Sequence, residues 1–249
     1  FFGDVGKFAF GGAISLLFVA GVPWQVPVTA FGSLALVCAL AVLLFMQESV
    51  RRTHASNASS IAEPASTGWG IRNKQGFIAL CLIEIIDSTT RNGFLTFIAF
   101  LMIARNLPAG WAAMSVPLIL VGGMAGKLAC GFLAERFGII RTVAVTEIAT
   151  GFGILSMLVL PDVAAYLLLP LVGVAVNGTS SVLYATIGDL VEKDRLPRAF
   201  GLFYTVGSIC GLVAPIAFGV IGDALGVEYS IALAGVLVFL TLPLCLMLR

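Results

Sequence analysis

Charge is scarce in this sequence. Asp, Glu, Lys and Arg make up 11% of the 249 residues, whereas hydrophobic residues make up 59%. A soluble domain carries about 25% charged residues, because a hydrated surface needs them. The shortage therefore excludes an ordinary water-soluble fold and indicates lipid as the main solvent. The net charge of +1 also gives no reason to expect a nucleic-acid partner.

The side chains of metal and disulfide chemistry are also few. The one histidine, His54, lies in a polar segment, and the five cysteines form no C-x-x-C pair. Each cysteine lies in an apolar stretch, as a small buried residue would. The sequence has neither the H-E-x-x-H pattern of zinc proteases nor the G-x-S-x-G pattern of hydrolases. We therefore expect no metal, no cofactor and no enzymatic activity.

Long hydrophobic runs, in contrast, fill most of the chain. A helix needs about 20 apolar residues to cross about 30 Å of hydrocarbon, and eight stretches have about this length. The sequence therefore predicts an all-α membrane protein with about eight transmembrane helices. The stretches are Val5–Val22, Pro27–Met46, Phe77–Ala104, Trp111–Ala134, Ile139–Leu160, Val163–Leu190, Ala199–Ile221 and Tyr229–Leu248.

One polar segment, Gln47–Gln75, separates the first two stretches from the other six. It is rich in Ser, Asn and Thr and contains Pro64, a composition typical of a mobile linker. We predict two helices of an N-terminal bundle in residues 1–46, a central loop in 47–76 and a six-helix C-terminal bundle in 77–249.

The basic residues predict the orientation. If the helices alternate in direction, most basic residues fall on the side of the long loop: Lys7, Arg51, Arg52, Arg72, Lys74, Arg136, Arg141, Lys193, Arg195, Arg198 and Arg249. The opposite side holds Arg105 with the acidic residues Asp162, Asp223 and Glu228. Because basic residues favour the cytoplasmic side, we expect the loop and the C-terminus there.

Three charged residues lie within the third stretch. Glu84, Asp87 and Arg91 follow i, i+3 and i+7 spacing and therefore share one helix face near mid-membrane. A lone charge at that depth costs several kcal/mol, so these groups must pair or face water. They can form a proton or substrate site in a central cavity. They can also be a self-neutralising helix face, in which Arg91 pairs with Asp87.

A polar stripe lies in the sixth stretch, where Asn177, Ser181 and Tyr184 follow i, i+4 and i+7 spacing. Such a stripe can contact a solute, or it can hydrogen-bond a neighbouring helix. The spacing leaves both interpretations open.

Two G-x-x-x-G patterns, Gly122/Gly126 and Gly207/Gly211, also occur in the apolar stretches. Their small residues indicate close helix packing.

The link between the fourth and fifth stretches reads Gly131-Phe-Leu-Ala-Glu-Arg-Phe-Gly-Ile-Ile-Arg141. It resembles the cytoplasmic loop motif of the major facilitator superfamily, G-x-L-a-D-r-x-G-r-k. Glu135 replaces the usual aspartate, and Arg141 comes one position after the usual basic pair. The matching residues are Gly131, Leu133, Ala134, Arg136 and Gly138.

A second segment supports this resemblance. The link from Asp189 through Arg195 and Arg198 resembles the one before the family's eleventh helix. The eight expected helices would then correspond to family helices five to twelve, and the chain would be a fragment of a twelve-helix transporter.

The resemblance implies a secondary active transporter that moves a small solute by alternating access, coupled to protons. Glu84 and Asp87 are then the proton-coupling candidates, and Arg91 is a partner for the solute or for a counter-ion. Asn177, Ser181 and Tyr184 would contact the solute. The alternative is a non-transporting membrane scaffold or regulatory subunit.

The resemblance also implies a cytoplasmic gate and a cellular setting. The gate residues would be Gly131, Glu135, Arg136, Gly138, Arg141, Asp189, Arg195 and Arg198. Glu135 would dock near Val5 or Gly6 at the start of the first helix when the gate is shut. Alternatively, Glu135 and Arg136 serve only topology and local pairing. We expect a multi-pass protein of a bacterial plasma membrane, monomeric when complete, with solute, protons and lipid as partners.

Overall fold

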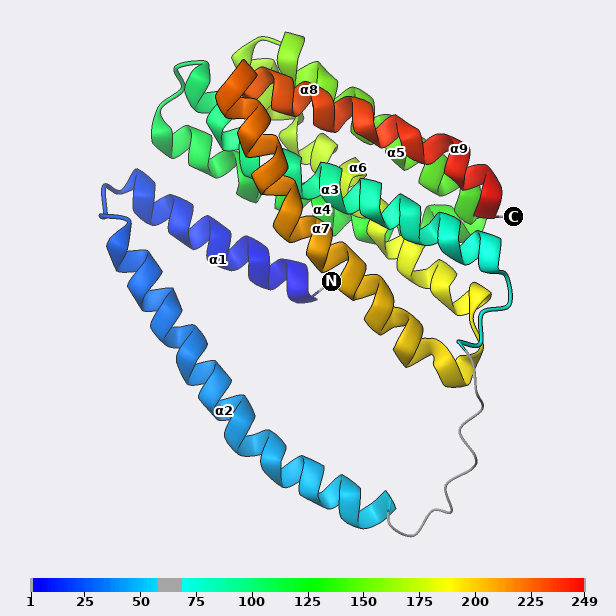
Figure 1. Cartoon of the computed structure of the whole chain (residues 1–249). Helices are drawn as coiled ribbons and strands as arrows, with labels where there is room; N and C mark the ends of the chain where they lie inside the picture. The colour runs from blue at the N-terminus through cyan, green and yellow to red at the C-terminus, as the bar shows by residue number, and fades with distance from the viewer. Residues whose placement is uncertain (1, 58–68, 249) are drawn as a thin grey trace. The chain divides into compact units, whose positions relative to one another are not determined.

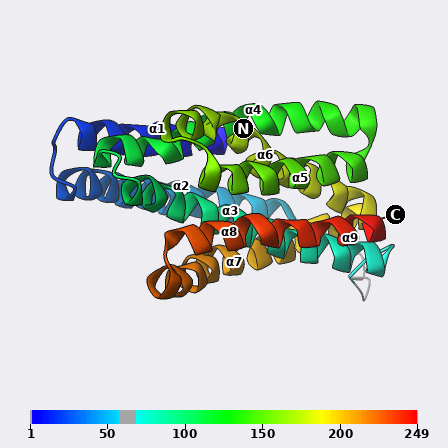
Figure 2. The ribbon, with the colours of Figure 1, turned by 90° about the horizontal axis from the view of Figure 1, so that it is seen from above.

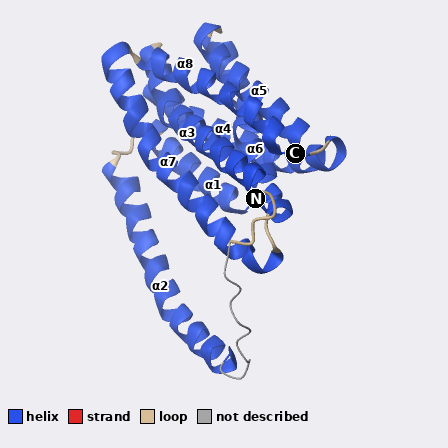
Figure 3. Ribbon diagram, turned by 45° about the vertical axis from the view of Figure 1, so that its right-hand side comes forward, coloured by secondary structure: helices blue, strands red, loops and turns tan. Residues whose placement is uncertain are grey.

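The computed structural model describes residues 2–57 and 69–248, and the side chains of 5–44 and 69–248. Within these residues it contains helices and no β-strand (Figure 3). The α-helices are α1 (Phe2–Val19), α2 (Gln25–Asn57), α3 (Lys74–Ala104), α4 (Ala109–Phe137), α5 (Ile139–Val159), α6 (Asp162–Leu190), α7 (Leu196–Leu225), α8 (Val227–Leu237) and α9 (Thr241–Cys245). Short 3-10 turns at Lys193–Arg195, Val238–Leu240 and Leu246–Leu248 precede α7 and flank α9.

Each of the eight predicted apolar stretches forms a helix, and the last one comprises α8 and α9 together. Six helical segments are long and apolar enough to cross a membrane. The apolar part of α1, Val5–Val19, is shorter. Helix α3 has the length but carries Glu84, Asp87 and Arg91 near its middle, so it is not uniformly apolar. The prediction of a membrane-type all-α bundle is confirmed.

The helix α2 is longer than the sequence predicted. It continues to Asn57, whereas the loop was expected to begin at Gln47. The segment after Gln47 contains Glu, Arg and Ala, which favour helix, and its first proline is Pro64. The predicted start of the loop was therefore too early. His54 belongs to this helix, and its side chain lies outside the described residues, as do residues 58–68.

Two compact units are present. One comprises residues 1–16 and 69–249, and the other comprises residues 17–68. The predicted division into 1–46, 47–76 and 77–249 stays a prediction.

Within the first unit, α3 has a central position. It contacts α4 and α6 on one side and α7 and α8 on the other (Figures 1 and 2). Asn73 caps the start of α3, because its side-chain oxygen accepts a 3.0 Å hydrogen bond from the backbone N–H of Gly76. Helix α3 therefore places its polar face among the other helices of this bundle.

The closest helix contact joins α4 and α6. A side chain at Gly122 would overlap the backbone of Pro170, and one at Gly126 would overlap the backbone of Val174. The prediction that Gly122 and Gly126 allow close packing is confirmed.

Two clusters of buried apolar side chains divide the bundle along its length. The first cluster includes Phe77 and Ile83 of α3, and the second includes Phe94 and Ile98 of the same helix. Helices α5 and α6 contribute residues to both clusters in the same way. The stretch of α3 between them carries Glu84, Asp87 and Arg91. The structure thus has a polar layer between two apolar layers.

Candidate functional site

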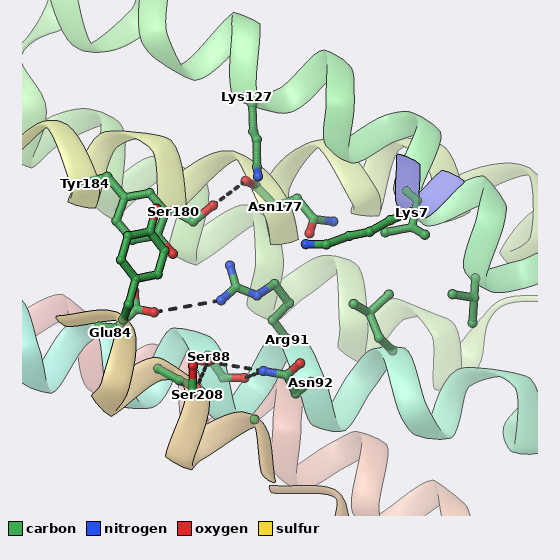
Figure 4. A pocket seen from close by; sticks show the side chains of 16 residues that line it. Lys7, Glu84, Ser88, Arg91, Asn92, Lys127, Asn177, Ser180, Tyr184 and Ser208 are labelled. Carbon is green, nitrogen blue, oxygen red and sulfur yellow. Dashed lines mark hydrogen bonds and ion pairs between the residues drawn. The ribbon is translucent and has the colours of Figure 1, made fainter. Parts of the chain in front are cut away.

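A cavity of about 450 Å³ lies in this polar layer. Side chains of α1, α3, α4, α6 and α7 line it (Figure 4). Its charged lining residues are Lys7, Glu84, Arg91 and Lys127. Charged side chains at such a depth are expected where water or a solute enters the bundle.

Arg91 lies between two carboxylates. Its Nη1 atom is 3.3 Å from Oδ2 of Asp87, and its Nη2 atom is 4.0 Å from Oε1 of Glu84. Glu84 and Asp87 are each 2% exposed. Glu84 Oε2 and Asp87 Oδ2 nevertheless form no hydrogen bond within the described part of the chain. The Arg91–Asp87 pair of the self-neutralising interpretation is present, and Glu84 and Arg91 also line a cavity, as the site interpretation requires.

The stripe of α6 divides between two environments. Asn177 and Tyr184 line the cavity, with Ser180 between them. Ser181 is not among the lining residues, and its hydroxyl donates hydrogen bonds to the carbonyl oxygens of Lys127, at 3.4 Å, and Gly178, at 2.8 Å. Ser181 therefore contacts the neighbouring helix α4, whereas Asn177 and Tyr184 face the cavity.

Small residues of α7 bring this helix close to the polar face of α3. The hydroxyl of Ser88 donates a 3.0 Å hydrogen bond to the carbonyl oxygen of Gly207. A Cβ atom at Gly207 would lie 2.6 Å from Oε1 of Glu84, and one at Gly211 would lie 3.2 Å from the amide of Asn92. Gly207 and Gly211 thus serve the cavity wall as well as helix packing.

Three charged residues of this region were not predicted to belong to the site. Lys127 is the one charged residue in the apolar part of α4, and it points into the cavity (Figure 4). Lys7 was counted among the basic residues that set the orientation, but it also lines the cavity. The third, Glu147, lies in α5 and has no exposed surface. Each is a single charged residue in an apolar run. This isolation was the one feature of the sequence that could have marked them as site residues.

Glu147 is buried next to an interruption in the last transmembrane segment. The hydroxyl of Thr241 lies 3.3 Å from Glu147 Oε2, while Oε1 forms no hydrogen bond within the described residues. Pro243 lacks the N–H that a regular helix would use, and the chain here passes from α8 through a 3-10 turn to α9. The polar layer therefore extends behind the cavity to α9.

Part of the predicted gate motif surrounds a second cavity, of about 370 Å³. Gly138, Arg141 and Asp189 line it. Gly138 joins α4 to α5 with φ 87°, a conformation that glycine adopts without strain. Glu135 and Arg136 are exposed, and the Arg136 guanidinium lies 5.7 Å from the ring centroid of Phe137.

Gly131 is also exposed, with open space around it. The docking of Glu135 near Val5 or Gly6 stays a prediction.

The other two predicted gate residues, Arg195 and Arg198, lie where the chain enters α3. The Arg198 guanidinium lies 5.0 Å from the ring centroid of Trp69, and Arg195 covers Gly70. Nearby, Ile71 and Val191 form an isolated antiparallel bridge. The segment before α3 is thus tied to the link before α7.

These features define a multi-pass membrane protein whose helices surround a charged cavity. Comparisons with known proteins agree. The family described as Major Facilitator Superfamily matches residues 131–249. The gentisate transporter of Corynebacterium glutamicum is 29% identical over 160 residues, which cover 63% of this chain and 36% of the relative. The uncharacterized MFS-type transporter YhjX of Escherichia coli K12 is 26% identical over 104 residues, 40% of this chain and 26% of YhjX.

Solved structures show the same fold. A mutant of the peptide transporter POT in complex with alafosfalin has a TM-score of 0.60 at 21% identity, covering 69% of this chain and 38% of the transporter. The complex of that mutant with sulfate has a TM-score of 0.61 at 20% identity, covering 69% and 37%. The chain thus spans about a third of the length of these proteins. The family match over residues 131–249 and the loop motif thus agree on similarity to the major facilitator superfamily.

Proposed function

We propose that this protein is a secondary active transporter, which moves a small solute across the membrane by alternating access coupled to protons. The observation that carries the proposal is the cavity in the polar layer, where Glu84 and Arg91 face the open space and Asp87 lies directly behind them. Charged groups inside a bundle of membrane-length helices are costly, and those that occur commonly mark a substrate or ion pathway.

The position of Arg91 offers a way to couple a proton to the solute. Its guanidinium is held near Asp87 and Glu84 by charge attraction. A proton on either carboxyl group would remove one of these attractions. Arg91 would then be available to bind a polar group of the solute. Proton binding and solute binding would support each other at one site.

The relatives support the class of function. One is described as a gentisate transporter and another as an MFS-type transporter, and both are bacterial. We take from them a small-molecule solute and a location in a bacterial plasma membrane. The distribution of basic residues favours the cytoplasm for the long loop and the C-terminus. Asn177 and Tyr184 would contact the solute, and Ser181 would hold α6 against α4. The complete protein would act as a monomer.

The gate would lie at the end of the bundle where Gly138, Arg141 and Asp189 surround the second cavity. Arg195 and Arg198 on the nearby link would belong to it, together with Gly131, Glu135 and Arg136. Charge pairs among these residues would hold the cytoplasmic side shut in one state and separate in the other.

Alternating access can be tested without knowing the solute. Ser208 lines the cavity and is exposed. In a variant whose native cysteines are replaced, a cysteine introduced as Ser208→Cys should react with a membrane-impermeant thiol reagent added from either side. A cysteine at an exposed position near the end of α4, introduced as Phe132→Cys, should react from one side. A scaffold protein would show one-sided reaction for both variants.

Coupling is tested in liposomes that contain the purified protein and a trapped pH-sensitive dye. Addition of a panel of carboxylates, amino acids, sugars and peptides should move protons for at least one solute. Asp87→Asn should abolish this proton movement, because it removes a titratable group next to Arg91. Asp223→Asn makes the same chemical change at an exposed site and should leave the movement intact. If no solute moves protons, the scaffold alternative gains.

A further inference from the structure

Three cationic side chains from three different helices converge on one space. Lys7 of α1, Arg91 of α3 and Lys127 of α4 all line the cavity, and Figure 4 shows their charged ends directed toward its centre. We infer that the cavity binds a small organic anion that carries a carboxylate, with Lys127 and Arg91 as its charge partners. This inference rests on the proposed transport function, since it names the solute class of the same site.

The balance of charge at the cavity surface supports an anion. Three cations line the cavity, against one carboxylate, Glu84. Asp87 lies behind the surface, 3.3 Å from Arg91. Glu147 is fully buried and hydrogen-bonded to Thr241, so it does not face a solute. A solute in the cavity therefore meets a positive surface, which attracts an anion and repels a cation.

Neutral polar groups stand beside the lysine. Figure 4 places Asn177 and Ser180 of α6 next to the end of Lys127. The Asn177 amide donates a hydrogen bond of 3.3 Å to the Gly173 carbonyl oxygen, a weak contact that a carboxylate oxygen can replace. A carboxylate accepts several hydrogen bonds at once. Lys127, Arg91 and Asn177 together supply such donors.

The size of the cavity and its apolar wall indicate an organic body on the anion. Pockets for small organic molecules begin at about 300 Å³, and this cavity holds about 450 Å³. Tyr184 and Tyr204 stack at one end with ring centroids 5.0 Å apart. Leu95 and Leu120 line another part of the wall. An inorganic ion would leave these surfaces without a partner, whereas a ring or short chain would cover them.

The proton step gives the anion a further role. A proton on Glu84 or Asp87 would leave the cations with less internal compensation, so the cavity would hold the anion more tightly. The anion would thus favour the protonated form, and the two would be carried together.

Binding of matched probes tests the inference. The purified protein is titrated with benzoate, its neutral isostere benzamide and its cationic isostere benzamidine, and in parallel with hexanoate and hexanamide. Binding is measured as the rise in unfolding temperature. We expect at least one carboxylate to bind about tenfold or more tightly than its amide, and benzamidine to bind least. Equal affinity for acid and amide in both series would overturn the inference.

Variants of Lys127 test whether the preference for carboxylates arises in this cavity. Lys127→Gln should weaken carboxylate binding by about tenfold or more and leave amide binding unchanged. Lys127→Arg keeps the positive charge and should bind carboxylates about as well as the unchanged protein. Lys193→Gln removes the same charge from an exposed residue of the α6–α7 link and should have no effect. If Lys127→Gln does not fold, Lys7→Gln is the second variant and should weaken carboxylate binding in the same direction. An equal loss in Lys193→Gln would contradict the assignment.

The transport proposal and the anion-site proposal can be rejected independently of each other. Carboxylate binding without movement of any solute in liposomes would retain the anion site and reject the transporter. Movement of a neutral or cationic solute, with no preference for carboxylates in binding, would retain the transporter and reject the anion site.

Discussion

The hydroxyl group of Thr241 lies 3.3 Å from Oε2 of Glu147, and neither residue has exposed surface. The two residues belong to segments 94 positions apart in the sequence. The threonine also bonds the carbonyl oxygen of Val238 at 2.6 Å, in the 3-10 turn before α9. A buried acid is thus held by the segment where the last transmembrane helix is irregular.

This contact predicts two different outcomes at Glu147. Glu147→Gln keeps the volume and an oxygen for Thr241, so the fold should persist with a similar unfolding temperature. Glu147→Ala leaves a cavity, which should lower the free energy of unfolding by about 2–4 kcal/mol. Denaturant unfolding in detergent measures both variants. Glu228→Ala, at an exposed position, should cost about 1 kcal/mol or less.

The α4–α6 contact gives a second prediction. Gly122→Ala places a methyl group against the Pro170 carbonyl oxygen, so the helices must separate. We expect a marked loss of stability, on the order of 1–3 kcal/mol. Gly188→Ala in α6 has open space around the new methyl group and should be neutral or slightly stabilising, by about 0.5–1 kcal/mol. Thermal unfolding of the two variants separates crowding from helix propensity. Equal effects would contradict the packing interpretation.

The contacts of Arg105 give a third prediction, at the end of the bundle away from the predicted gate. Its Nη1 and Nη2 atoms donate to the carbonyl oxygens of Leu160, at 3.1 Å, and Leu158, at 2.9 Å, where α5 ends. It also lies 3.5 Å from Asp162, whose side chain is 50% exposed. Arg105→Gln should destabilise the protein by about 1–3 kcal/mol, because it orphans the two carbonyl groups. Asp162→Asn removes only a partly exposed ion pair and should cost less than about 1 kcal/mol.

Because Asn177 and Ser181 of α6 lie in different environments, we expect one substitution to affect probe binding and the other to affect stability. Asn177→Ala should weaken binding of the preferred probe with little change in unfolding temperature, because Asn177 lines the cavity. Ser181→Ala should leave probe binding unchanged and lower stability by about 1 kcal/mol, because Ser181 bonds the Lys127 carbonyl oxygen on α4. Titration and thermal unfolding of the same two samples provide the measurement. The opposite pattern would place Ser181, and not Asn177, at the solute.

The helices and the shared face of Glu84, Asp87 and Arg91 follow from the sequence for a simple reason. Apolar length and helical periodicity are local properties, so they can be read from one segment alone. Lys127 and Glu147 were missed because a single charge has no spacing pattern. The rotation of each helix decides whether such a charge meets lipid, a cavity or another helix.

The same limit explains the division at α6. Asn177 and Ser181 share one helix face by spacing, yet one meets the cavity and the other meets α4. The boundary between these environments depends on how closely α4 approaches, and the glycines that set this distance lie some 50 residues earlier in the chain. The end of α2 was misplaced for a different reason, since a polar sequence with good helix formers is compatible with both loop and helix.

The bridge between Ile71 and Val191 has a consequence for how the bundle can move. The backbone N–H of Arg72 donates to the carbonyl oxygen of Leu190, and that of Glu192 donates to Gly70, each at 2.9 Å. This bridge therefore joins the segments that precede α3 and α7, although more than 100 residues separate the starts of the two helices. A force on the long loop would therefore act on both helices together, and so on two adjacent walls of the cavity.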